Sequence, residues 1–199
     1  MEETKSLLII FYRNPKIGKV KTRLAATVGN ERALAVFREL CLHTKAITEN
    51  LPFDKIVFYT DSVDLMDMWP NATYLKALQH GEELGEKMSS AFLGGFESGY
   101  NAICVIGTDC YELTEKIILH AFDALRSADV VIGPARDGGY YLLGMTRPLP
   151  ELFQNKQWST ETVLRDTIHD FESLQLRYVK LQELNDVDTE DDLPDALKN

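Results

Sequence analysis

Residues 7–24 read LLIIFYRNPKIGKVKTRL, in which six apolar or aromatic residues run directly into a basic segment. A short apolar run of this composition is typical of a buried strand. Pro15 and Gly18 then predict a loop, because both residue types favour turns. The loop gathers positive side chains without a single acid: Arg13, Lys16, Lys19, Lys21 and Arg23. The stretch therefore predicts a strand whose carboxyl end opens into a positively charged loop.

The remainder of the chain alternates short apolar runs with segments of helical periodicity. Further strands are predicted at residues 55–60, 102–108, 129–134, 140–145 and 174–181, with a weak strand within 72–78. Helices are predicted at residues 30–51, 84–99, 113–128 and 159–171. This alternation predicts an α/β fold with three α/β/α layers, in which helices cover both faces of a mostly parallel sheet. The strand at 140–145 follows its predecessor too closely for a helical crossover, so we expect it to be antiparallel.

Composition and length narrow the class of protein. A chain of 199 residues fits one domain, which we place at residues 1–199. Cys41, Cys104 and Cys110 are odd in number and form no CxxC pair, which favours reduced thiols and a cytoplasmic location. No apolar run is long enough to span a membrane. The formal net charge of -10 argues against nucleic-acid binding, which relies on broad neutralisation of phosphates.

The charge is distributed unevenly along the chain, and this allows two interpretations of the basic loop. Residues 1–38 carry an excess of Lys and Arg, whereas residues 183–195 contain Asp and Glu but neither Lys nor Arg. In the first interpretation the loop binds phosphate through its backbone N–H groups, through the lysines and through two parallel hydrogen bonds from Arg23. In the second, it is a solvated surface loop that pairs with the acidic segment.

Two acids follow predicted strands, where ligands bind in open α/β sheets. Asp109 comes after the strand at 102–108 and is suited to a hard cation such as Mg²⁺, although it is also placed to cap the next helix. Asp137 precedes Gly138 and Gly139 in a predicted tight turn that exposes backbone to a ligand. Asp137 is therefore a candidate catalytic residue, and the alternative is an ordinary Asp-Gly hairpin turn.

The acidic segment near residue 190 offers a second carboxylate for a metal ion. Asp188, with Asp186 nearby, is placed to complete a metal site with Asp109. The alternative is that Asp188 or Thr189 caps a helix that starts at residue 190. The chain contains neither HExxH nor GxSxG, so zinc hydrolase and serine hydrolase chemistry are disfavoured.

Six motifs, taken in order, resemble those of a bacterial family of uncharacterised glycosyltransferase-like proteins of GT-A type. They are NPKIGKVKTRLA (14–25), LGEKMSSAF (84–92), VIGTDC (105–110), GPARDGGYYLLGM (133–145), WSTETVL (158–164) and DVDTEDDL (186–193). That family is similar to the molybdopterin guanylyltransferase and phospholactate guanylyltransferase group. The resemblance extends over residues 7–195.

This resemblance implies a Rossmann-like nucleotide-diphospho-sugar transferase fold that binds a nucleotide with Mg²⁺ or Mn²⁺. It implies that the phosphates contact Lys16, Lys19, Lys21 and Arg23, and that Asp109 and Asp188 hold the metal. Asp137, Gly138 and Gly139 match the loop on the acceptor side.

The implied activity is transfer of a group from a metal-bound nucleotide-sugar to a small acceptor. One alternative is a nucleotidyltransferase that uses an NTP and releases pyrophosphate. Another is a non-catalytic nucleotide-binding protein with a decayed site, because Asp109 is followed by Cys110 and Tyr111 where a DxD motif would continue.

Overall fold

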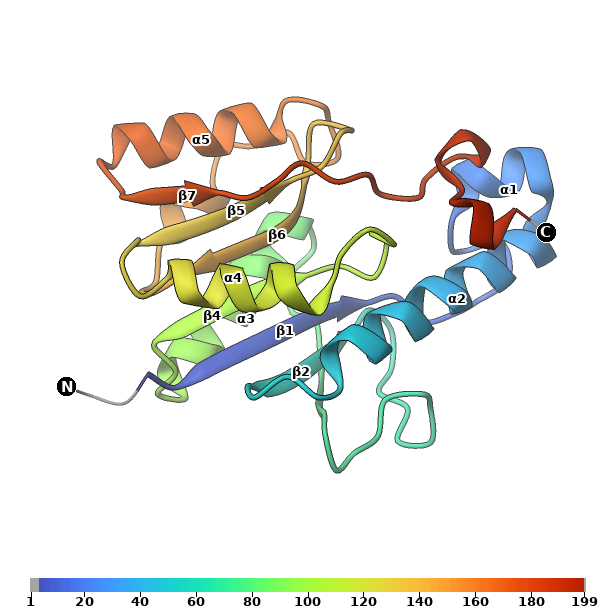
Figure 1. Cartoon of the computed structure of the whole chain (residues 1–199), viewed down its shortest axis with the longest axis horizontal. Helices are drawn as coiled ribbons and strands as arrows, with labels where there is room; N and C mark the ends of the chain where they lie inside the picture. The colour runs from blue at the N-terminus through green and yellow to red at the C-terminus, as the bar shows by residue number, and fades with distance from the viewer. Residues whose placement is uncertain (1–3, 199) are drawn as a thin grey trace.

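A seven-stranded sheet forms the centre of the computed structural model, which describes residues 4–198 (Figure 1). The strand order across the sheet is β3-β2-β1-β4-β6-β5-β7. The strands are β1 (Ser6–Tyr12), β2 (Asp54–Tyr59), β3 (Leu75–Leu78), β4 (Ala102–Ile106), β5 (Val130–Pro134), β6 (Tyr140–Met145) and β7 (Tyr178–Lys180). The sheet confirms the predicted α/β class and the predicted strands.

The pairing of the strands creates a topological switch point beside β1. β1 pairs in parallel with β2 on one side and with β4 on the other. The chain therefore leaves β1 toward one edge of the sheet and later returns on the opposite side. A crevice forms at the carboxyl ends of the two strands at such a point. β6 is antiparallel to both β4 and β5, so the sheet is mixed as expected.

Helices cover the two faces of the sheet and enclose separate apolar cores. One face packs against α2 (Asn30–Thr48) and α4 (Glu115–Ala124), and the other against α3 (Leu84–Glu97) and α5 (Val163–Ser173) (Figure 1). The inner strands β4 and β5 are buried along their whole length. This explains their continuous apolar sequences, because a strand covered on both faces has no solvent side to keep polar.

The segment after β7 crosses the molecule and returns to the beginning of the chain. It runs beside β5, where Leu184 and Ala135 form a parallel bridge, and then passes β4, where the Val187 N–H donates to the carbonyl of Asp109. Leu193 and Leu197 pack with Leu24 in a third apolar cluster formed with α2 and α1 (Thr22–Val28). This segment, red in Figure 1, thus carries Asp186 and Asp188 to the end of β1.

Several element boundaries differ from those predicted, and no helix was predicted at α1. α5 begins at Val163 instead of residue 159, because Ser159 has a φ of 63°, which an α-helix does not accept. The last strand is confined to Tyr178–Lys180. The helix predicted from residue 190 is instead two short 3₁₀ turns, Glu190–Asp192 and Asp195–Leu197, since a proline separates them.

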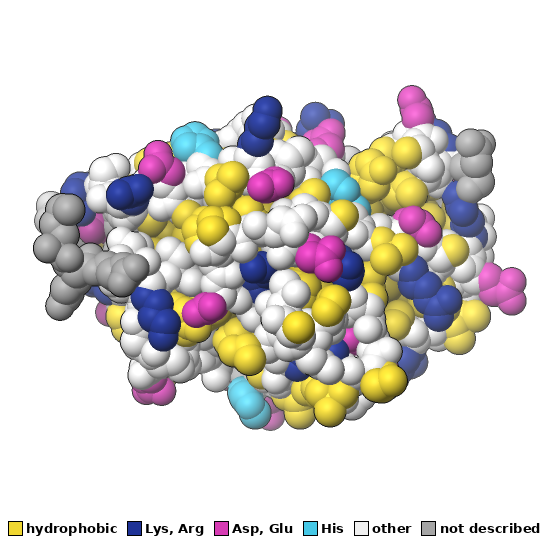
Figure 2. Space-filling view, turned by 60° about the horizontal axis from the view of Figure 1, so that its bottom comes forward, with side chains coloured by type: hydrophobic (Ala, Val, Ile, Leu, Met, Phe, Trp, Pro, Cys, Tyr) yellow, Lys and Arg dark blue, Asp and Glu magenta, His cyan; other side chains and the backbone are white. Residues whose placement is uncertain are grey.

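The surface seen in Figure 2 mixes dark blue basic and magenta acidic side chains among yellow apolar ones, so the excess of negative charge is not collected on that face. Within residues 4–198, no helix combines the length and the apolar character that crossing a bilayer requires.

The adjacent Gly94 and Gly95 in α3 provide a test of how this helix packs on the sheet. A Cβ on Gly95 would lie 2.5 Å from Cδ1 of the fully buried Ile103, whereas nothing lies within 4 Å of one on Gly94. We expect Gly95→Ala to destabilise the protein by about 1–3 kcal/mol through overpacking. We expect Gly94→Ala to stabilise it by about 0.5–1 kcal/mol, because the exposed helix gains propensity. Urea denaturation of both variants measures the difference, and equal effects would contradict the packing.

Candidate functional site

A cavity of about 930 Å³ opens at the switch point, beyond the carboxyl ends of β1 and β4. Its charged end is formed by the loop after β1, the loop after β4 and the returning segment. The residues of this end are Arg13, Lys21, Arg23, Asp109, Asp186 and Asp188. The cavity therefore brings together most of the charged residues that the sequence singles out, although they come from three distant parts of the chain.

The ammonium of Lys21 lies between two carboxylates. Its Nζ is 2.7 Å from Oδ1 of Asp109 and 3.2 Å from Oδ1 of Asp188, and only 5% of the Lys21 side chain is exposed. The backbone of Lys21 is left-handed, with φ 47° and ψ 49°, and its carbonyl accepts the first hydrogen bond of α1 from Ala25. The side chain of Lys21 lines the cavity, whereas Lys16 and Lys19 of the same loop are exposed outside it.

The two carboxylates keep Lys21 positively charged despite its burial. Burial alone lowers the pKa of the Lys21 ammonium, but Asp109 and Asp188 offset this effect and the pKa is raised above its usual value. The ion pairs confirm that the basic loop pairs with the acidic segment, as the second interpretation expected, although Lys21 does so inside the cavity and not on a solvated surface. Phosphate binding by the loop stays a prediction.

Asp186 carries an unpartnered oxygen at the base of this cluster. Its Oδ1 is buried and has no hydrogen-bond partner among the described residues. Burial, together with the nearby negative charges of Asp109, Asp137 and Asp188, raises the pKa of Asp186 to about 7. Over its whole lining the cavity has five acidic side chains, Asp109, Asp137, Glu161, Asp186 and Asp188, against three basic ones, Arg13, Lys21 and Arg23.

Asp192 organises the turn that presents Asp188. Its Oδ2 accepts hydrogen bonds from the backbone N–H groups of Asp188 and Thr189 and from the Thr189 hydroxyl. Its Oδ1 accepts from the side chain of Asn185. Thr189 is therefore the residue that caps the 3₁₀ turn, and the carboxylate of Asp188 stays available to Lys21. Asp192 is not among the residues predicted for the site, although Thr189 and Asp192 have the spacing of a capping box.

The predicted turn at Asp137 is present and is fixed to α5. Oδ1 of Asp137 accepts a hydrogen bond of 2.8 Å from the Gly139 N–H, and Asp137 itself is exposed on the cavity. Gly138 has a φ of 87°, and a Cβ there would lie 2.2 Å from the carbonyl oxygen of Glu161. Only glycine fits at this position. The hydrogen bond from Leu164 to the Gly138 carbonyl then ties the turn to the start of α5.

The opposite end of the cavity is apolar and aromatic. It is lined by Phe11, Leu84, Met88, Tyr140 and Trp158. The indole of Trp158 lies directly on Gly85, because a Cβ there would be 2.4 Å from its Nε1. None of these five residues is among those predicted for the site. The only sequence signal of this aromatic wall is a glycine in the first turn of α3, whose partner lies more than seventy residues away.

The predicted phosphate-binding residues separate into two groups. Lys21 and Arg23 line the cavity, and so does Arg13. The Arg23 guanidinium is 3.5 Å from Asp188, and 69% of its side chain is exposed. Lys16 and Lys19 are exposed and lie outside the lining, and Lys16 pairs with Asp61 at 3.0 Å.

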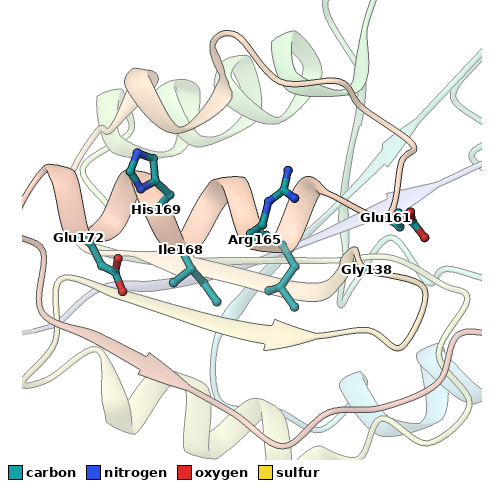
Figure 3. A pocket seen from close by; sticks show the side chains of 7 residues that line it. Gly138, Glu161, Arg165, Ile168, His169 and Glu172 are labelled. Atoms are coloured by element: carbon teal, nitrogen blue, oxygen red, sulfur yellow. The ribbon is translucent and has the colours of Figure 1, made fainter.

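A second, shallower hollow of about 490 Å³ lies along α5 on the other side of the Gly138 turn. Figure 3 shows Arg165 and His169 projecting from one side of the helix, with Ile168 and Glu172 on the other. Gly138 is the only predicted site residue in its lining. Most of the predicted site residues therefore line the larger cavity.

The charged cluster can be tested for its fit to a divalent cation. Among residues 4–198, no group of three or more His, Cys, Asp or Glu side chains is arranged to hold a metal ion. Asp109 and Asp188 nevertheless converge on one point, where the Lys21 ammonium lies, and Asp186 offers an unused oxygen beside them. Because Mg²⁺ commonly takes only one or two carboxylates together with substrate phosphates, this donor set suits such an ion.

Comparisons with known proteins identify a family and a solved structure that resemble this chain. One family, described as "Uncharacterized protein conserved in bacteria (DUF2064)", matches residues 43–160. A solved structure from Desulfovibrio desulfuricans G20, described as a "putative nucleotide-diphospho-sugar transferase", is 30% identical. The similarity covers 94% of this chain and 84% of that chain, with a TM-score of 0.87.

More distant structures share the fold at low identity. The inositol-1-phosphate CTP transferase from T. maritima is 11% identical, with a TM-score of 0.58 over 100% of this chain and 95% of that chain. The manganese complex of Rv0371C from Mycobacterium tuberculosis H37Rv is 12% identical, with a TM-score of 0.55 over 95% and 96%. A search of curated proteins finds no match. The chain has the nucleotide-diphospho-sugar transferase fold, as predicted.

The partly buried carboxyl of Asp186 makes the stability of the protein depend on pH. Its pKa is raised to about 7 in the folded state, so folding favours the protonated form. Its contribution to stability is present below its unfolded pKa, near 4, and is lost as the pH rises through about 7. We expect Asp186→Asn to be more stable than the wild type at pH 8, by an amount on the order of a few kcal/mol.

The advantage of this variant shrinks toward pH 4, because the carboxyl is then neutral in both states. Urea denaturation across pH 4–8, with EDTA present, measures the difference in unfolding free energy. An advantage that does not change with pH would show that Asp186 is not buried beside other acids.

Proposed function

This chain belongs to the DUF2064 family, and we propose that it is a transferase that moves a group from an activated nucleotide to a small acceptor. The donor that we favour is a nucleotide-diphospho-sugar. The observation that supports this proposal most directly is the cluster of Lys21, Asp109 and Asp188 at the switch point of the sheet. Phosphate ligands bind at this place in open α/β sheets. The name given to the relative that is 30% identical supports the same donor class.

The basic residues of the cavity are the proposed phosphate contacts. Arg23 is exposed on the cavity and has a planar guanidinium, which suits two parallel hydrogen bonds to a phosphate. Lys21 adds a compact charge with three donors. Lys16 and Lys19 lie outside the cavity lining, so we leave them out of the proposed direct contacts.

The proposed chemistry is stabilisation of a negatively charged leaving group. When the sugar leaves the nucleotide, negative charge grows on the diphosphate, and cations fixed nearby lower the barrier to that step. A Mg²⁺ or Mn²⁺ ion held by Asp109 and Asp188 would add Lewis-acid charge at the same phosphates. Arg23 and Lys21 orient the diphosphate so that the bond to be broken faces the rest of the cavity.

The acceptor is proposed to bind between the Asp137 turn and the aromatic wall. Asp137 is exposed, lies on the cavity and is held by its own turn. Its carboxylate is placed to orient an acceptor hydroxyl or take its proton. The neighbouring Tyr140 and Trp158 give that part of the cavity an apolar surface, which favours an acceptor with an apolar or planar portion.

A nucleotidyl transfer is the second candidate, in which an acceptor oxygen attacks the α-phosphate of an NTP and pyrophosphate leaves. The sequence after β4 favours this candidate, because Asp109 is followed by Cys110 and Tyr111 and does not begin the DxD motif of ordinary GT-A sugar transferases. The second carboxylate of the cluster therefore comes from Asp188 and not from a DxD motif. The same basic residues would serve this reaction, because pyrophosphate also leaves with negative charge.

A thermal-shift panel of UDP-, GDP-, ADP- and dTDP-sugars and the four NTPs, each with Mg²⁺, Mn²⁺ or EDTA, tests the proposal. A ligand at about 100 times its Kd adds roughly 2.7 kcal/mol of stability. We expect a metal-dependent shift with one nucleotide-sugar, and release of the corresponding nucleoside diphosphate when the acceptor is supplied. A shift confined to an NTP would replace sugar transfer by nucleotidyl transfer, and no shift with any compound would reject both.

Arg23→Ala and Lys19→Ala form a matched pair for the phosphate contacts. Both remove a positive side chain from the same loop, but only Arg23 lines the cavity. We expect Arg23→Ala to weaken binding of the identified nucleotide by about 1.5–3 kcal/mol, the range for a hydrogen bond to a charged group. Lys19→Ala should change it little. Isothermal titration calorimetry measures both, and an equal loss in the two variants would show only a general effect of charge.

A further inference from the structure

We propose that Lys21 is an internal cation that holds Asp109 and Asp188 until the phosphates of a nucleotide draw its ammonium away and a divalent cation takes its place. This inference deepens the proposed function and rests on it. Its consequence is that the divalent cation and the nucleotide bind as a pair, because each needs the other to displace Lys21. The metal alone should bind the wild-type protein weakly.

The contact geometry shows that the ammonium and a metal ion compete for the same oxygens. Oδ1 of Asp109 and Oδ1 of Asp188 both face Nζ of Lys21, at 2.7 and 3.2 Å. A Mg²⁺ ion bound at about 2.0–2.1 Å from these oxygens would lie against the ammonium. Two cations at such a separation repel each other strongly, and most strongly away from solvent. One of them must leave.

The charge of the cluster explains why a phosphate ligand shifts this balance toward the metal. The lining of the cavity already has more acidic than basic side chains, because Asp137 and Glu161 lie on it in addition to Asp109, Asp186 and Asp188, against Arg13, Lys21 and Arg23. A nucleotide adds several negative charges to it. The phosphates attract Lys21, and the carboxylates that it releases then need another cation. A divalent ion neutralises both groups of oxygens at once.

The fold confines the exchange to one side chain. Val20, before Lys21, is buried, and Thr22, after it, begins α1. The left-handed backbone of Lys21 is therefore held on both sides, and its long stem is the part that is free to turn. Val187, between Asp186 and Asp188, is also buried, and its N–H is bonded to the backbone of Asp109. The carboxylates stay in place while the cation between them changes.

Binding of Mn²⁺ alone, without any nucleotide, tests the exchange separately from the proposed function. The Kd of Mn²⁺ is measured from the loss of its free-ion electron paramagnetic resonance signal. The variants are Lys21→Met, which removes the ammonium but keeps an unbranched side chain, and Lys19→Met as a control for loss of one charge from the same loop. We expect at least tenfold tighter binding in Lys21→Met and a change of less than twofold in Lys19→Met.

Equal affinities in the wild type and Lys21→Met would overturn the proposal, and so would equal gains in the two variants, which would indicate a general charge effect. A second measurement remains decisive if Lys21→Met does not fold. In the wild type, Mn²⁺ and inorganic pyrophosphate together should raise the Tm by more than the sum of their separate shifts. Additive shifts would overturn the proposal. A negative result in the nucleotide panel would reject the proposed transferase without changing these metal measurements.

Discussion

The ion pairs of Lys21 with Asp109 and Asp188 are the interaction on which the arrangement of the cavity depends. They join the loop after β1, the loop after β4 and the segment that follows β7. None of these segments is near another in sequence. Because the Lys21 side chain is almost fully buried, its ammonium is costly unless it is paired. The two carboxylates supply this pairing, and backbone bonds such as that from Val187 to Asp109 hold them in position.

Much of this could be predicted because the sheet places the ends of its parallel strands together. The apolar runs predicted the strands β1 and β4. The polar residues directly after both strands predicted one shared site at their carboxyl ends. Asp109 and Asp188 do meet, and the antiparallel β6 follows from the short connection after β5. These inferences needed only the alternation of apolar and polar residues and the rules for connecting strands.

The remainder could not be predicted, because it depends on the conformation of single residues and on distant packing. Nothing in the sequence indicates that Lys21 has a positive φ, or that its side chain lines the cavity while those of Lys16 and Lys19 do not. Asp186 and Asp188 look alike in sequence, but one has a buried, unpartnered oxygen and the other an ion pair. Trp158 contacts Gly85, and no local sequence pattern indicates that these two residues are close in space.

The path of the acidic segment also has a consequence for the order in which the site is assembled during synthesis. A ribosome completes every strand of the sheet before it makes residues 183–198. Until then Lys21 and Arg23 are present without Asp186 and Asp188, so this end of the cavity carries more positive charge in the incomplete chain than in the complete structure. The packing of Leu193 and Leu197 against α1 and α2 then holds this segment in place, and the carboxylates of Asp186 and Asp188 offset the positive charge. The charge of the site is therefore complete only after the segment that follows β7 has been made.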